Sequence, residues 1–247
     1  MEIALLALVG FLAQLIDGAL GMAYGVTCNS LLLAFGYPPA AASASVHLAE
    51  VATSGVSGHF HWKLGNVDKT LFKQLVWPGM AGGALGAYTL SNLPGDNLRP
   101  WIAAYLGIMG VRILYKAASA NRRQTSGRHR TQVLGFVGGL FDAIGGGGWG
   151  PIVTTTLVDR GLEPRMAIGS VNRAEFFVTL VQSFTFALFV GFAHWQVILG
   201  LCLGGVAAAP LAAYVARWLR AETLMFMVGI LIVALSIRTI LASVGIL

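Results

Sequence analysis

The sequence predicts an all-α polytopic membrane protein made of two repeats with inverted topology. Each repeat is expected to hold one broken, re-entrant helical segment and three transmembrane helices. Of the 247 residues, 56% are apolar and only 11% are charged, which exceeds what the interior of a soluble protein requires. The net charge of +6 suits a basic cytoplasmic face, and no soluble basic domain suggests nucleic-acid binding. An internal duplication predicts the two repeats, and the distribution of the basic residues predicts their inverted topology.

The duplication is clearest in two glycine-rich stretches. Residues 10–25 read GFLAQLIDGALGMAYG and residues 135–150 read GFVGGLFDAIGGGGWG, at an offset of 125. The match continues into the following segments, where Gly36, Pro39, Ser45 and Glu50 correspond to Gly161, Pro164, Ser170 and Glu175. The chain therefore divides into a first repeat, a basic linker and a second repeat, at residues 1–117, 118–130 and 131–247.

Each repeat begins with an apolar stretch that glycines interrupt. The first covers roughly residues 3–35 and breaks near 18–25, and the second covers roughly 132–158 and breaks near 143–150. We expect each stretch to form two pieces of about 13 residues, near 20 Å long at 1.5 Å per residue. Such pieces are too short to cross a hydrocarbon core of about 30 Å, so the stretch is expected to re-enter on the side from which it came.

Three longer apolar segments follow in each repeat. Each holds about 20 residues, which is enough to cross the hydrocarbon core. The expected helices cover residues 39–60, 71–91 and 98–117, then 165–190, 195–216 and 222–244. Small residues in two of these segments should let helix backbones approach closely; they are Gly79, Gly82, Gly83 and Gly86, with Gly204, Gly205, Ala208 and Ala209 in the second repeat.

The basic residues choose between two topologies. If the broken stretches span the membrane, there are eight spans, and Lys and Arg divide about 9 against 5 between the two sides. If the stretches re-enter, the repeats are inverted and 13 of the 16 Lys and Arg residues share one side: Lys63, Lys69, Lys73, Arg112, Lys116, Arg122, Arg123, Arg128, Arg130, Arg160, Arg165, Arg217 and Arg220. Because basic loops concentrate in the cytoplasm, we expect the inverted topology, with both termini outside.

Four acidic residues lie within apolar segments at matched positions of the repeats. Asp17 matches Asp142 and Glu50 matches Glu175. Ionisable groups in membrane helices are energetically unfavourable and mark functional sites. The two aspartates stand just before the breaks, where a carboxylate can instead cap the half-helix that follows. The glutamates lie within a helix and are the stronger candidates for carrying a coupling proton.

The broken helices also suggest where an anion would bind. Half-helices that restart after Gly21 and Gly146 present free N–H groups and a positive dipole end. Arg173 lies well inside a helix, where it either pairs with a carboxylate or receives an anionic substrate. We expect a small oxyanion between the two opposed hairpins, with these candidate contacts: Arg173, Asn172, Ser170, His47, Ser45, Tyr24, Gly25, Thr27, Asn29, Gly148, Trp149 and Gly150.

Other chemistries have weaker support. His47 near Ser43 and Ser45 is the one candidate for an enzyme site, and no HExxH motif is present. We therefore expect no catalytic residue, no bound metal and no cofactor. Two alternatives to a coupled anion transporter stay open: a passive anion channel, and a metal or cation permease that uses Asp17, Asp142, His59 and His61.

The chain resembles the TauE/SafE sulfite exporter family over essentially its whole length. The resemblance lies in GFLAQLIDGALGMAYGV, GYPPAAASASVHLAE, GFVGGLFDAIGGGGWGP and GLEPRMAIGSVNRAE. It implies export of sulfite, an organosulfonate or a related small anion across the bacterial cytoplasmic (inner) membrane. The first copy departs from the glycine-rich pattern, with Met22-Ala23-Tyr24 opposite Gly147-Gly148-Trp149.

Residues and resemblance together predict a secondary transporter that works by alternating access and is coupled to protons. Its expected partners are the small anion, protons and membrane lipids. The glycine-rich helix faces would also permit a homodimer.

Overall fold

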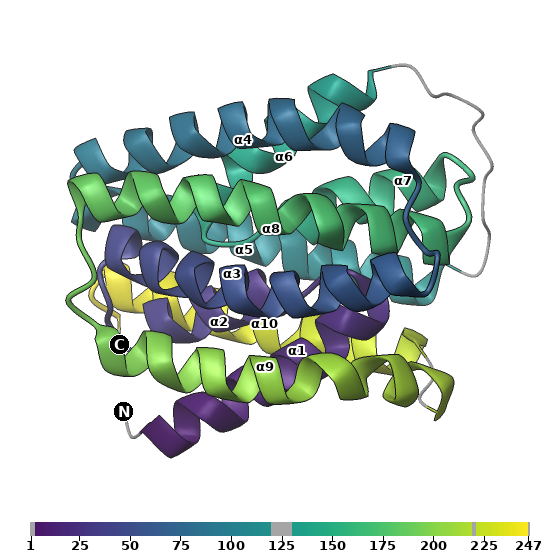
Figure 1. The fold of residues 1–247 in the computed structure, drawn as a ribbon. Helices are drawn as coiled ribbons and strands as arrows, with labels where there is room; N and C mark the ends of the chain where they lie inside the picture. Colours follow the sequence, from purple (N-terminus) through teal and green to yellow (C-terminus); the bar gives the residue numbers. More distant parts are fainter. Residues whose placement is uncertain (1–2, 120–129, 219–220, 247) are drawn as a thin grey trace.

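The computed structural model describes residues 3–119, 130–218 and 221–246, and this part of the chain is helical apart from its short connections (Figure 1). The first repeat contains α1 (Ile3–Leu20), α2 (Tyr24–Ala34), α3 (Pro39–Lys63), α4 (Lys69–Asn92) and α5 (Gly95–Ala118). The second contains α6 (Thr131–Gly145), the π-helical turn η1 (Gly150–Thr154), α7 (Thr155–Asp159), α8 (Pro164–Phe189), α9 (Trp195–Trp218) and α10 (Ala221–Ser243). The predicted helix ends agree with these bounds to within three residues.

The two predicted breaks are present, and glycine geometry explains them. The first helical piece ends where Gly21 takes φ 66°, and α6 ends where Gly146 takes φ 67°. This left-handed conformation is open to glycine without the steric penalty that a Cβ adds. Ala23 also adopts a positive φ, 114°, which is strained for a residue with a side chain.

The prediction of two similar short pieces in each broken stretch was wrong. α1 has 18 residues and α2 has 11, while α6 has 15. At 1.5 Å per residue α1 is about 27 Å long. The reason is that helical hydrogen bonding continues past Asp17 and Gly18 and stops only where Gly21 turns the chain.

Helix contacts repeat when the two halves are exchanged. α1 packs against α9 as α6 packs against α4, and α3 packs against α9 as α8 packs against α4. Two pairs of counterparts also pack on each other: α3 with α8, and α5 with α10. Figure 1 shows that such counterparts run in opposite directions, and that each broken stretch returns to the end of the bundle where it began. Both chain termini lie at the same end.

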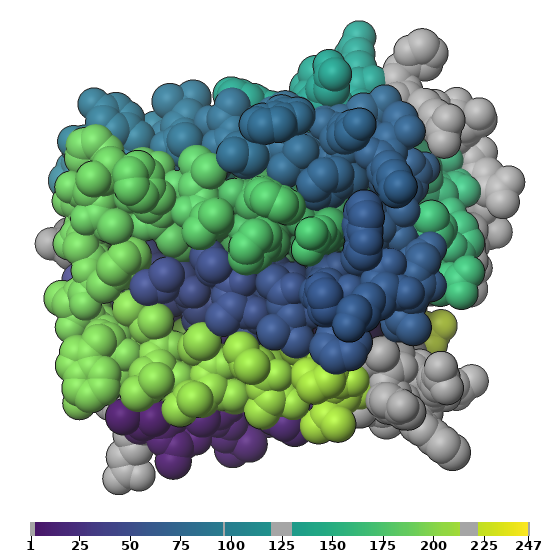
Figure 2. Space-filling view, viewed as in Figure 1, coloured from purple at the N-terminus to yellow at the C-terminus, as the bar shows by residue number. Residues whose placement is uncertain are grey.

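The exterior is apolar. α4, α8, α3 and α9 form the face seen in Figure 2, and large side chains such as Phe184 and Leu188 are exposed on α8. Four helices are long and apolar enough to cross a membrane: α1, α5, α9 and α10. α3 and α8 are less apolar because their buried sides carry polar residues. The composition of the chain and its apolar exterior are therefore those of a multi-pass membrane protein.

Basic residues gather at the end of the bundle opposite the termini. The α3–α4 connection holds Lys63 and Lys69 there, and Arg160 and Arg165 flank the connection into α8 (Figure 1). Most of the predicted linker 118–130, with Arg122, Arg123 and Arg128, lies outside the described residues, as does Arg220.

The predicted packing role of the small residues is confirmed. A Cβ on Gly82 would collide with the carbonyl oxygen of Phe136 in α6, and one on Gly204 would collide with that of Ala7 in α1. The two contacts join equivalent pairs of helices in the two halves, α4 with α6 and α9 with α1. Backbones at this separation gain van der Waals contact that larger side chains would prevent.

We expect Gly82→Ala to lower stability by about 1–3 kcal/mol, because the backbone that it meets cannot move aside. Gly95→Ala is the matched control, since a Cβ there meets its nearest neighbour, Pro39 Cδ, at 3.4 Å. Thermal unfolding of the detergent-solubilised proteins measures both. A Gly82→Ala protein that melts at the wild-type temperature would contradict the packing assigned to α4 and α6.

Candidate functional site

Each broken helix is bridged by its own aspartate. Asp17 Oδ1 accepts a hydrogen bond from Tyr24 N at 3.2 Å, and Asp142 Oδ1 accepts one from Trp149 N at 2.9 Å. Both carboxylates are buried, and each receives the first free N–H of the piece that follows the break. The capping role that the sequence left open is thus present at both positions.

The two breaks pack directly on one another. Asn29 Nδ2 donates to Gly145 O at 2.6 Å, and Thr154 Oγ1 donates to Gly21 O at 2.8 Å. Positions 29 and 154 are counterparts in the duplication, and their acceptors differ by one position, because Gly21 corresponds to Gly146. A Cβ on Gly25 would lie only 2.8 Å from the Cα of Gly147. The backbones meet at the centre of the bundle with no space for a side chain between them.

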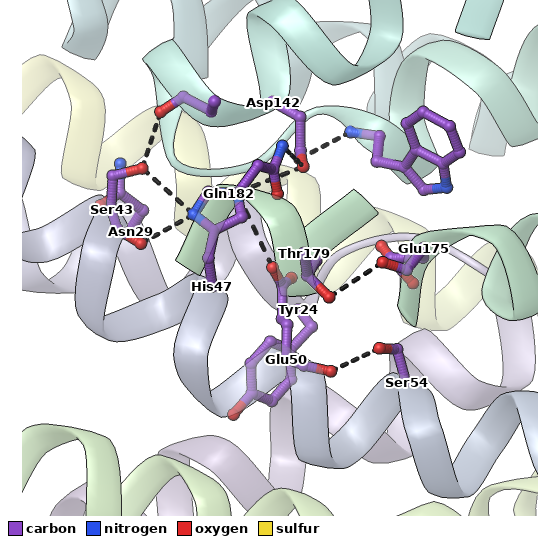
Figure 3. Close-up of polar contacts among 12 residues, drawn as sticks. Tyr24, Asn29, Ser43, His47, Glu50, Ser54, Asp142, Glu175, Thr179 and Gln182 are labelled. Atoms are coloured by element: carbon purple, nitrogen blue, oxygen red, sulfur yellow. Dashed lines mark hydrogen bonds and ion pairs between the residues drawn. The ribbon is translucent and has the colours of Figure 1, made fainter. Parts of the chain in front are cut away.

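A buried polar cluster lies beside this contact and joins the two halves (Figure 3). His47 Nε2 lies 3.2 Å from Asp142 Oδ2, and Gln182 Nε2 donates to the same oxygen at 3.0 Å. His47 and Gln182 are completely buried, and Asp142 is 2% exposed. α3, α6 and α8 therefore each contribute one member.

The two ring nitrogens of His47 face two different oxygen atoms. His47 Nδ1 lies 2.7 Å from the carbonyl oxygen of Ser43, and a carbonyl can only accept, so Nδ1 carries a hydrogen. A neutral imidazole would then present a lone pair from Nε2 to the carboxylate. The 3.2 Å contact is a hydrogen bond only when His47 is an imidazolium or Asp142 is protonated. The geometry therefore suits a pair that holds one proton between Nε2 and Oδ2.

The glutamates extend the cluster along α3 and α8. Glu50 Oε2 lies 4.0 Å from His47 Nε2 and has no hydrogen-bond partner among the described residues. Glu50 is 4% exposed and Glu175 is 7% exposed. Their backbone oxygens accept from the repeat counterparts Ser54 and Thr179 (Figure 3). The two glutamates thus occupy equivalent settings.

Several buried donors near the centre are unpartnered within the described part of the chain. They include Thr27 Oγ1, Asn172 Nδ2 and Tyr105 OH. Tyr105 fills the space beside the second break, where a Cβ on Gly148 would collide with its hydroxyl. Buried polar groups normally have partners, so these donors mark places where water or a polar ligand can bind.

Other predicted contacts use their polar atoms in packing. Ser170 Oγ accepts from Asp68 N at 2.8 Å and Ser45 Oγ donates to Ala41 O at 2.7 Å. The aromatic side chains on the breaks are anchored to neighbouring helices, where the Tyr24 hydroxyl donates to Leu201 O and the Trp149 indole to Val171 O.

Arg173 lies apart from the polar cluster. Its guanidinium carbon is 5.6 Å from the centre of the Trp62 ring and 5.7 Å from that of Phe177. It lines a groove on the outer side of α3 and α8 together with His59. The structure therefore separates Arg173 from its neighbour Asn172, which is 1% exposed.

Sequence reasoning missed Gln182 and Tyr105. Gln182 follows Glu175 by seven residues, which places both on one face of α8, and an amide in an apolar helix was the available signal. Tyr105 gave no comparable signal, because a tyrosine in a membrane helix is common at an interface.

The structure offers no support for the metal alternative. His61 Nδ1 lies 3.3 Å from Asn66 Nδ2, and His59 faces the outer groove. Within the described ranges, no three His, Cys, Asp or Glu residues are grouped as metal ligands would be.

Comparison with known proteins agrees with this architecture. The family described as Sulfite exporter TauE/SafE matches residues 6–239. The chain belongs to the TauE/SafE family. The Probable membrane transporter protein YtnM of Bacillus subtilis (strain 168) is 43% identical over 249 residues, covering 97% of this chain and 83% of that protein. No solved structure gives a significant match. This TauE/SafE protein is therefore a membrane transporter and not an enzyme.

We expect Asp142→Asn to destabilise the protein by about 1–3 kcal/mol. The asparagine would place either an N–H₂ group or a less basic oxygen against the nitrogens of His47 and Gln182. Asp17→Asn is the matched control, since Asn can still accept from Tyr24 N through its side-chain oxygen. Thermal unfolding of both variants provides the comparison. Equal melting temperatures would show that the His47 and Gln182 contacts contribute nothing to stability.

Proposed function

We propose that this TauE/SafE protein is a proton-coupled secondary transporter that exports sulfite, an organosulfonate or a related small sulfur-containing anion. The observation that carries the proposal is the buried contact between the His47 imidazole and the Asp142 carboxylate, located where the two halves meet. Ionisable groups buried in membrane helices characterise proton relays in transporters. The family supplies the class of substrate.

The helix directions support an inverted-repeat topology. Counterpart helices run oppositely and exchange their contacts (Figure 1), which corresponds to a pseudo-two-fold axis in the membrane plane. In this arrangement the end that carries Lys63 and Arg165 faces the cytoplasm. Both termini then lie outside the cytoplasmic membrane.

Alternating access would open the contact between the two breaks. Gly25 and Gly147 touch in the described conformation, so an anion can pass this level only after they separate. Separation would break the Asn29–Gly145 and Thr154–Gly21 hydrogen bonds. The two breaks would then separate as one repeat rocks against the other around the site.

Proton occupancy is linked to this opening through His47. With hydrogens on both ring nitrogens, His47 would donate one hydrogen bond to Ser43 O within α3 and another to Asp142 in α6. Loss of the shared proton would leave two lone pairs facing each other, which removes a hydrogen bond and leaves buried atoms unsatisfied. Deprotonation therefore weakens the contact between α3 and α6.

Electrostatics couples the anion to the same protons. Glu50 and Glu175 are buried near Asp17 and Asp142, and ionised carboxylates would repel an anion strongly at low dielectric constant. An anion held by donors such as Thr27, Asn172 and Tyr105 therefore requires protonated neighbours. Proton and anion should bind together, and net export would then be driven by an outward gradient of the anion.

Anion uptake into proteoliposomes tests the function, with sulfite, sulfoacetate, taurine and sulfate compared. We expect accumulation of at least one sulfur anion to be faster when the outside is more acidic than the lumen, because protons would bind with the anion. Flux that ignores the gradient would establish a passive channel. Flux of a metal cation with none of any anion would support the cation permease.

His47→Gln should remove the pH dependence of transport while the protein still folds, because glutamine can replace the hydrogen bond to Asp142 but cannot release its proton. We expect the gradient-driven rate to fall about a hundredfold or more, the effect typical for loss of a proton-transfer group. His194→Gln is the control, since His194 packs edge-on against Tyr37 away from the cluster. Unchanged gradient-driven transport by His47→Gln would refute the proton assignment.

Glu50→Gln and Glu175→Gln test whether the two glutamates carry the coupling proton. Each mimics a protonated carboxyl permanently, so we expect anion binding to persist while its pH dependence diminishes. Binding measured by thermal stabilisation at several pH values reports this directly. Loss of binding in both variants would instead indicate that the ionised carboxylates hold the site together.

A further inference from the structure

A groove of about 620 Å³ lies on the outer side of the bundle between α3 and α8. Its walls are largely apolar and include Val51, Val56 and Phe176, while His59 and Arg173 also face it. The polar cluster at the centre makes no use of these residues. The groove is thus an amphipathic site distinct from the proposed transport path.

Two cations meet beside the groove on one indole ring. Arg173 Cζ and Lys69 Nζ each lie 5.6 Å from the centre of the Trp62 ring. Within the described residues, neither cation forms an ion pair with a carboxylate. Cation–π contact holds each of them, but two like charges in one place favour a shared anionic partner.

The duplication shows that the fold itself does not require these charges. At the offset of 125, Arg173 corresponds to Leu48 and His59 to Phe184. The equivalent surface at the other end of the bundle is therefore apolar. A cationic groove at one end only indicates a ligand that is present on one side of the membrane.

The position of the groove indicates on which side of the membrane the ligand is present. Lys69 starts α4 directly after the α3–α4 connection, at the end of the bundle that carries the basic residues (Figure 1). By the charge rule this end is cytoplasmic, and the cytoplasmic leaflet is rich in anionic lipid. Exposed Trp62 and Phe60 suit the boundary between headgroups and acyl chains.

We propose that this groove binds one anionic phospholipid from the cytoplasmic leaflet. Its phosphate would lie between Arg173 and Lys69, and an acyl chain would follow Val51, Val56 and Phe176. The proposal is independent of the transported substrate. It assigns to Arg173 a lipid contact in place of the predicted substrate contact.

Thermal unfolding of the full chain in mixed micelles tests the site, with phosphatidylglycerol compared with phosphatidylcholine at equal mole fraction. We expect phosphatidylglycerol to stabilise the wild type more, with an apparent affinity about fivefold higher for each cation engaged. Arg173→Gln and Lys69→Gln should each lower the apparent affinity for phosphatidylglycerol about fivefold. Arg165→Gln should retain the full preference, because Arg165 is exposed on the same helix beside Glu163.

Equal stabilisation of the wild type by the two lipids would overturn the proposal, as would a full phosphatidylglycerol preference in Arg173→Gln. Sulfite that displaces phosphatidylglycerol at stoichiometric occupancy would also overturn it, because Arg173 would then be a substrate contact. A second measurement keeps both cations in place and compares the wild type with one conservative variant. Dibrominated phosphatidylglycerol should quench wild-type fluorescence more than dibrominated phosphatidylcholine, and the difference should shrink in Trp62→Phe.

Discussion

The contact between the two glycine breaks is the constraint on which the rest of the structure depends. Gly25 and Gly147 approach so closely that neither position accepts a Cβ, and Asn29 and Thr154 tie each break to the other half. The aspartates then fix each break from within its own repeat. Helices far apart in the chain are thereby brought together at one point, and the buried polar residues can gather only there.

Around that point, a symmetric scaffold carries asymmetric chemistry. The caps made by Asp17 and Asp142 are equivalent, but only Asp142 also receives His47 and Gln182. The residue that corresponds to His47 in the second repeat is Asn172, which cannot exchange a proton near neutral pH. One half therefore holds the histidine, and the other supplies an amide nitrogen that has no partner among the described residues. The outer surface is asymmetric in the same way, because Arg173 in the second repeat corresponds to Leu48 in the first.

Lipid is the solvent of this fold and explains how its residues are distributed. Helices on the outside, such as α10, are apolar nearly all round, whereas α3 and α8 bury serines, threonines and carboxylates against each other. Association between helices then relies on small residues and polar contacts. The polar cluster in this core adds hydrogen bonds to the junction between the halves.

The sequence by itself determined the fold class, the six long helices that follow the broken stretches, the breaks and the four buried carboxylates, because hydropathy and the duplication are local or strictly periodic. It could not determine that Gln182 joins Asp142, since that contact depends on how α6 and α8 pack. The length of α1 was also missed, because the choice among Gly18, Gly21 and Gly25 depends on which glycine the opposite break contacts. Asn172 and Arg173 show the limit most plainly. Successive residues of a helix point about 100° apart, so only the rotation of α8 against its neighbours decided that Asn172 is buried and that Arg173 lines the outer groove.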